Sequence, residues 1–222
     1  MEHGYFATAA ERLKATAILV LVAAVLCLPA SSAFASTITS YVGASGPGLG
    51  IVTFGSVATP SPGNDDVAGA SPNTIIITEK RFDTFDAIWT IYEVANDGIP
   101  SVEYQLTETV VNNTGTDWIG YQVMLGSGTD AGWVHASLGT GLDFDLPDDN
   151  SPRNFSVFPA LAYDEVTINA GGGVILAGET HVFTYAIDIP DGITKFTIRT
   201  SAREQPIATE SGTWGKIKAL FR

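Results

Sequence analysis

The sequence predicts an all-β protein, an antiparallel β-sandwich of the Ig-like or jelly-roll-like kind. Short runs of β-branched and aromatic residues are separated by Gly, Pro, Asn and Asp along most of the chain. Several runs alternate apolar and polar residues with a period of two, which indicates strands with one buried face. No segment between residues 36 and 208 has a sustained helical period. Many short strands with turns at this spacing are typical of a sandwich.

The composition is that of an acidic globular protein. The 222 residues include 11 Lys and Arg against 24 Asp and Glu, a formal net charge of −13. Only 16% of the residues are charged and 45% are hydrophobic, which distinguishes the chain from a disordered acidic segment. The acidic sign argues against nucleic acid as a partner, because binding to phosphates needs a basic surface.

Residues 1–35 are typical of a signal peptide. Arg12 and Lys14 precede an apolar run at 15–28, and Ala33-Phe34-Ala35 offers a cleavage site after Ala35. The run is shorter than the roughly 20 residues that span a bilayer, so no transmembrane anchor is expected after cleavage. The only cysteine, Cys27, would be removed with the signal, which leaves no thiol chemistry and no disulfide. The expected location is extracellular or at the cell surface.

The first half of the remaining chain begins with two strands, at 37–42 and 51–57. A loop with three prolines follows at 58–72. The next strand, 74–82, starts with three isoleucines, as expected of a central strand that is apolar on both faces. A further strand is predicted at 85–92, where Phe85, Ala87, Trp89 and Ile91 occupy alternate positions.

A hairpin is predicted at 102–125. Its first strand alternates polar residues with Val102, Tyr104, Leu106 and Val110. The segment 112–117 contains Asn-Thr-Gly, whose residues tolerate positive φ, and 118–125 is the return strand.

The second half has shorter predicted strands. A loop-rich region, 126–150, contains a short strand at 133–138. The other predicted strands are 155–158, 165–169 and 174–176 around a Gly171-Gly172-Gly173 turn, then 181–189 and 193–200.

The sandwich domain is therefore placed at 36–207, and 208–222 is interpreted as a linker with a short basic amphipathic tail. Trp214, Ile217 and Phe221 fall on one helical face, with Lys216 and Lys218 away from it. This tail could dock on the sandwich, lie on a membrane surface, or be recognised by a sorting or assembly partner, and the preceding linker favours recognition.

Three stretches of the sequence resemble the exported β-sandwich ectodomains of bacterial PEP-CTERM-type proteins. They are 112–126, with Asn-Asn-Thr-Gly-Thr-Asp-Trp at its start, 176–191, with Leu-Ala-Gly-Glu-Thr at its start, and 196–206. The resemblance spans residues 74–206 and implies a non-enzymatic protein of the cell surface or its matrix. The segment 214–222 departs from that group, whose members end in Pro-Glu-Pro, an apolar helix and an arginine cluster, so we do not expect processing by that sorting route.

An acidic segment is the candidate metal site. Asp143, Asp145, Asp148 and Asp149 lie close together, and their carboxylates are ligands that Ca²⁺ prefers. The segment lacks the glycine and the distal glutamate of an EF-hand loop, so a solvated acidic loop is the favoured interpretation. No other cofactor is expected.

Two tryptophans are candidates for stacking on sugar rings. Trp89 and Tyr104 lie on apolar faces and should be buried, whereas Trp118 and Trp133 flank loops and could be exposed. Aromatic residues at such positions more often belong to the core.

No catalytic residue is assigned. His135 lies near Asp130 and Ser137 in the sequence, but the chain has no Gly-x-Ser-x-Gly elbow, and His181 opens a strand. We therefore expect a non-enzymatic protein that acts by binding or assembly, with polysaccharide or other surface proteins as partners. The alternatives are a secreted carbohydrate-active enzyme and a calcium-stabilised adhesion module.

Overall fold

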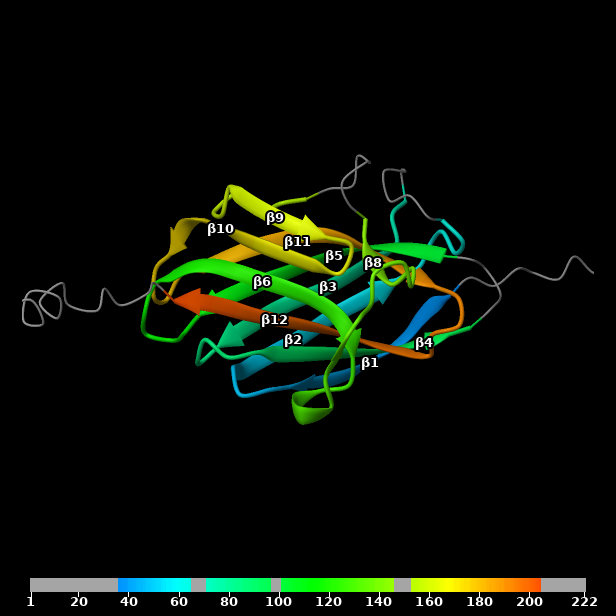
Figure 1. Cartoon of the computed structure of the whole chain (residues 1–222), viewed down its shortest axis with the longest axis horizontal. Coiled ribbons are helices and arrows are strands. Elements are labelled where there is room, and N and C mark those ends of the chain that lie inside the picture. The colour runs from blue at the N-terminus through cyan, green and yellow to red at the C-terminus, as the bar shows by residue number, and fades with distance from the viewer. Residues whose placement is uncertain (1–35, 65–70, 97–100, 146–152, 205–222) are drawn as a thin grey trace, which may run out of the picture. The chain divides into compact units, whose positions relative to one another are not determined.

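The computed structural model describes residues 36–64, 71–96, 101–145 and 153–204. These residues form an all-β structure of two packed sheets (Figure 1). Sheet A contains, in spatial order, β1 (Thr37–Ser45), β4 (Ile88–Ala95), β12 (Lys195–Glu204), β6 (Trp118–Ser127), β10 (Thr167–Ile175) and β9 (Ala160–Asp164), with β7 (Val134–His135) paired to β6. Sheet B contains β2 (Leu49–Ala58), β3 (Thr74–Phe82), β5 (Ser101–Asn112), β11 (Thr180–Pro190) and β8 (Asp143–Phe144).

The core lies between the two sheets and is rich in aromatic rings. The ring centroids of Phe82 in sheet B and Trp118 in sheet A are 5.2 Å apart. Those of Tyr121 in sheet A and Phe183 in sheet B are 4.8 Å apart. Each such ring buries a large apolar area, and the contacts between sheets hold the two layers together.

The predicted all-β class is confirmed, and several predicted strands match observed ones. The strand predicted at 74–82 is β3, and the one at 181–189 is β11 with one more residue at each end. Trp89 and Tyr104 are buried as predicted, with 7% and 0% of their surface exposed. The helical content of the described residues is one short 3-10 turn, η1 (Asp130–Gly132). None of their helices has the length and apolarity needed to cross a membrane.

The predicted hairpin at 102–125 is wrong. β5 lies in sheet B, β6 lies in sheet A, and the segment between them crosses from one sheet to the other. Two successive strands, each with one apolar face, can pair in one sheet as a hairpin or lie in two different sheets that face each other. The alternation of apolar and polar residues is the same in both arrangements, so it could not distinguish them. Asn112 fixes the crossing, because its side-chain amide donates to the carbonyls of Thr116 and Ile175, at 2.9 and 3.2 Å.

The predicted turn at Gly171–Gly173 is also wrong, because β10 continues through all three glycines. A Cβ atom on Gly173 would lie 1.7 Å from the carbonyl oxygen of Val157, so the glycine allows another segment to cross closely. That segment contains the predicted strand 155–158, which instead forms a turn, with the Phe158 amide donating to the Phe155 carbonyl at 2.7 Å. Phe155 and Phe158 are buried in the core.

Sheet B is mixed, because one of its strand pairs is parallel, whereas the prediction was an antiparallel sandwich. β3 and β5 pair in parallel, with Ile75 opposite Leu106. The intervening β4 lies in sheet A. The chain therefore leaves sheet B after β3 and returns in the same direction as β5.

A bulge in β3 changes which residues face the core. The register of β3 shifts between Ile77 and Lys80 against β5. Ile75 and Ile77 are buried before the shift, and Lys80 and Phe82 are buried after it. The bulge thus turns a lysine into the interior.

The predicted signal peptide at 1–35 and the tail at 208–222 lie outside the described residues.

Candidate functional site

A hollow of about 200 Å³ lies beside β6 and β7, and it is the candidate binding site. Its apolar lining includes Val134, Leu142 and Ile193. The side chains that can form hydrogen bonds there are Ser127, His135, Ser137, Thr140 and Lys195. The lining contains no carboxylate, although the whole chain is strongly acidic.

Trp133 is the residue before Val134, which lines this hollow, and its indole lies against Gly126, another lining residue. A Cβ atom on Gly126 would lie 2.6 Å from the indole ring, so the ring rests directly on the backbone of β6. The turn before Trp133 places Gly128 at φ +72° and Asp130 at φ +49°. The indole is partly exposed, and Val134 beside it is 62% exposed. Exposed apolar groups beside a hollow are typical of binding surfaces.

His135 is held by Thr167, the first residue of β10, and by Val166, which precedes β10. Its Nε2 atom lies 3.2 Å from the Thr167 hydroxyl and 3.4 Å from the Val166 carbonyl oxygen. These contacts fix the ring at the hollow. His181 lies at the start of β11, where its Nε2 atom is 3.5 Å from a carboxylate oxygen of Glu179.

Lys195 is one of the residues that line the hollow. Its side chain is half exposed, and its Nζ atom lies 3.9 Å from a carboxylate oxygen of Glu93. An exposed pair at this distance contributes little to stability and leaves the ammonium able to contact a ligand.

The two candidate tryptophans have different positions. Trp118 is fully buried, which agrees with the favoured interpretation that it belongs to the core, and it offers no surface for stacking on a sugar. Its indole N–H donates to the Thr114 hydroxyl at 3.2 Å, and its ring packs against Phe82 and Tyr121. Trp133 alone of the two has surface available to a ligand.

The acidic segment is partly described. Asp143 lies in β8 opposite Asp188 of β11, and Asp188 lies opposite Glu103 of β5 on its other side. Burial and the charge of Glu165 raise the pKa of Asp143, and a hydrogen bond with Asp188 acts in the opposite direction. Asp145 follows β8, while Asp148 and Asp149 lie outside the described residues. Within the part of the chain that the structure describes, no three His, Cys, Asp or Glu side chains are grouped to hold a metal ion.

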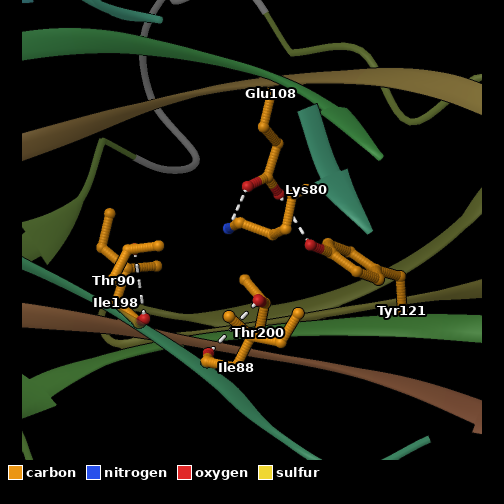
Figure 2. Close-up of polar contacts among 7 residues, drawn as sticks. All are labelled: Lys80, Ile88, Thr90, Glu108, Tyr121, Ile198 and Thr200. Atoms are coloured by element: carbon orange, nitrogen blue, oxygen red, sulfur yellow. Dashed lines mark hydrogen bonds and ion pairs between the residues drawn. The ribbon is translucent and has the colours of Figure 1, made fainter. Parts of the chain in front are cut away.

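The core contains a polar cluster that the sequence analysis missed. Lys80 and Glu108 form a direct ion pair, and both side chains are fully buried (Figure 2). The Tyr121 hydroxyl donates to the other carboxylate oxygen of Glu108 at 2.8 Å. Burial, followed by the charge of Glu108, raises the pKa of Tyr121 and Tyr185 well above the usual value.

Two threonines of sheet A, Thr90 and Thr200, face this cluster, and their hydroxyl groups form hydrogen bonds within sheet A. The Thr90 hydroxyl donates to the Ile198 carbonyl, and the Thr200 hydroxyl to the Ile88 carbonyl, each at 3.4 Å (Figure 2). The ion pair is thus enclosed by side chains and has no exposed surface.

Comparison of the chain with protein-family models, with curated proteins and with solved structures finds no significant match.

Proposed function

We propose that this chain is an exported, non-enzymatic sandwich protein of the Ig-like or jelly-roll-like kind, which binds polysaccharide at the cell surface or in its matrix. The proposal places the binding site at the hollow beside Trp133. The observation that carries it is the partly exposed indole, held over Gly126 next to a lining of hydroxyl groups.

The chemistry of the hollow suits a sugar. An indole face stacks on the apolar face of a pyranose ring, and hydroxyl side chains exchange hydrogen bonds with its hydroxyl groups. Lys195 belongs to the lining, and an ammonium group pairs with a carboxylate, so a sugar acid is the preferred ligand. The absence of a carboxylate from the lining means that the hollow itself offers no acid pair for glycoside hydrolysis.

The test is calorimetric titration with oligogalacturonate, and with a neutral maltooligosaccharide for comparison. We expect the acidic sugar to bind and Trp133→Ala to weaken its binding by about 5- to 150-fold, because loss of a stacking face removes roughly 1–3 kcal/mol. Gly126→Ala should have a similar effect, since the new methyl group would overlap both the Val134 carbonyl oxygen and the indole ring and force them to move.

Gly132→Ala is the matched control, because a Cβ atom there meets no atom within 4 Å. Wild-type affinity in both Trp133→Ala and Gly126→Ala would contradict the proposed site. No heat of binding with either sugar would contradict its proposed ligand class.

A calcium-stabilised adhesion module is the second candidate, and the in-register carboxylates of Asp143 and Asp188 favour it. If Ca²⁺ binds there, millimolar calcium should raise the melting temperature, and chelator should reverse the change. Asp143→Asn should abolish the calcium response. A melting curve that calcium leaves unchanged would exclude this candidate.

The tail at 208–222 completes the proposal. Its recognition by a sorting or assembly partner predicts that removal of 209–222 changes localisation while the melting temperature stays the same. A large fall in melting temperature would instead favour docking of the tail on the sandwich.

A further inference from the structure

The buried pair of Lys80 and Glu108 has the geometry of two groups that can react with each other. Lys80 lies in β3 and Glu108 in β5, which are neighbouring parallel strands of sheet B. Both backbones are therefore held in place by the sheet, and the two side chains meet end to end in the core (Figure 2). We propose that Lys80 and Glu108 condense in the folded protein to form an amide that joins β3 to β5 covalently. This inference does not depend on the proposed function.

Proximity supplies the first reason. Two groups held in contact by a rigid scaffold react as if each were present at a very high concentration, so the entropy loss of a bimolecular reaction is avoided. The bulge in β3 orients Lys80 inward, toward Glu108, instead of toward solvent.

Burial supplies the second reason. Both side chains are fully buried, and an enclosed ion pair is costly because each charge has lost its hydration. An amide carries no charge, so its formation removes this cost. The exclusion of water also disfavours the reverse reaction, hydrolysis.

The reaction balances without any other reactant. One proton moves from Nζ to Oε2, and the resulting amine attacks the Cδ atom of Glu108. A second proton passes from Nζ to Oε2, the Cδ–Oε2 bond breaks, and Oε2 leaves as water. The amide nitrogen keeps the third proton. The positive charge of Lys80 and the negative charge of Glu108 are lost together.

Tyr121 is placed to assist this step. Its hydroxyl donates to Oε1 of Glu108 at 2.8 Å, and Oε1 is the oxygen on which negative charge develops when the amine attacks Cδ. A donor already oriented toward that oxygen stabilises the tetrahedral intermediate. The raised pKa of Tyr121 keeps its hydroxyl protonated and able to donate.

The test is the mass of the intact, purified protein under denaturing conditions. The wild type should be lighter than its amino-acid sequence requires by the mass of one water molecule. Because processing of the N-terminus also changes the mass, the wild type is compared with Lys80→Met and Glu108→Leu, each corrected for its substitution. Both variants should show the full, uncrosslinked mass. This readout does not require that the variants fold.

Peptide mapping locates the bond. Trypsin should fail to cleave after Lys80, and a branched peptide should contain both Lys80 and Glu108. Lys195→Met is the matched control: its exposed ammonium lies 3.9 Å from Glu93, and we expect the mass deficit to persist in this variant. Tyr121→Phe should lower the crosslinked fraction at least tenfold at early times after refolding.

A folded wild type whose mass equals the uncrosslinked value, after days of incubation, would overturn the proposal. So would a mass deficit that survives in Lys80→Met, because the water would then be lost elsewhere in the chain.

Discussion

Single residues in the core carry the largest expected energies, and Lys80 and Glu108 are the clearest case. Removal of one partner leaves the other as a buried group without its counterion, which typically costs about 3–5 kcal/mol. We therefore expect Lys80→Met and Glu108→Leu each to have a free energy of unfolding lower by about this amount than that of the double variant, which lacks both charges. The double variant should unfold at a higher urea concentration than either single variant. Equal stabilities for the three variants would show that the two side chains are not coupled.

A second single residue, Asp83, makes a pH-dependent contribution to the free energy of unfolding. Its carboxylate accepts hydrogen bonds from the Asn113 amide at 2.8 Å and the Arg81 guanidinium at 3.1 Å. The Asn113 hydrogen bond is the main cause of a lowered pKa. Because the folded pKa lies below the unfolded one, this stabilisation is present above about pH 4 and is lost as the pH falls through the folded value.

The corresponding measurement is the melting temperature from pH 7 to pH 2. Asp83→Asn should melt slightly below the wild type at pH 7, and the two curves should converge in acid. Asn113→Ala should reduce the same pH dependence. A difference between Asp83→Asn and the wild type that stays constant across the range would contradict this assignment.

The two residues of the core pair differ in how far the sequence predicts them. Glu108 occupies the apolar face of its strand, between Leu106 and Val110, so a period of two already places a carboxylate in the core. Lys80 cannot be placed in this way, because the alternation that buries Ile75 and Ile77 would turn Lys80 outward. Only the bulge in β3 reverses this orientation of the Lys80 side chain, and the sequence of β3 has no clear signature of a bulge.

At the scale of elements, glycines decide how closely segments approach. Gly173→Ala should lower the free energy of unfolding by at least about 2 kcal/mol, because its methyl group would overlap the backbone of Val157. Gly171→Ala is the matched control, since its Cβ atom would meet the Ile119 carbonyl oxygen at an ordinary 3.6 Å. Urea unfolding of the two variants gives the comparison, and equal losses would contradict the packing described here.

The sequence predicts the existence of strands better than their partners. β3 starts with a run of β-branched residues, Thr74–Thr78, and ends at Phe82. The pairing of β3 with β5 depends on β4 lying in the other sheet, which is a property of the whole chain. The same reason explains why 102–125 resembles a hairpin in sequence while its strands lie in different sheets.

At the scale of the whole molecule, the acidic composition and the hollow contrast with each other. The chain carries a net charge of −13, yet the lining of the hollow contains His135 and Lys195 and no carboxylate. Trp133 could be nominated from the sequence because it flanks a loop. The remaining lining could not, because His135, Lys195 and Ile193 are brought together by the pairing of β6 with β7 and β12.

Amide chemical shifts in a titration with oligogalacturonate test the proposed binding site most directly. We expect concentration-dependent shifts at Gly126, Ser127, Lys195 and the segment 133–140, together with the Trp133 indole N–H signal. Shifts confined to other parts of the molecule, such as β8 and β11 around Asp143 and Asp188, or no shifts at all, would contradict it.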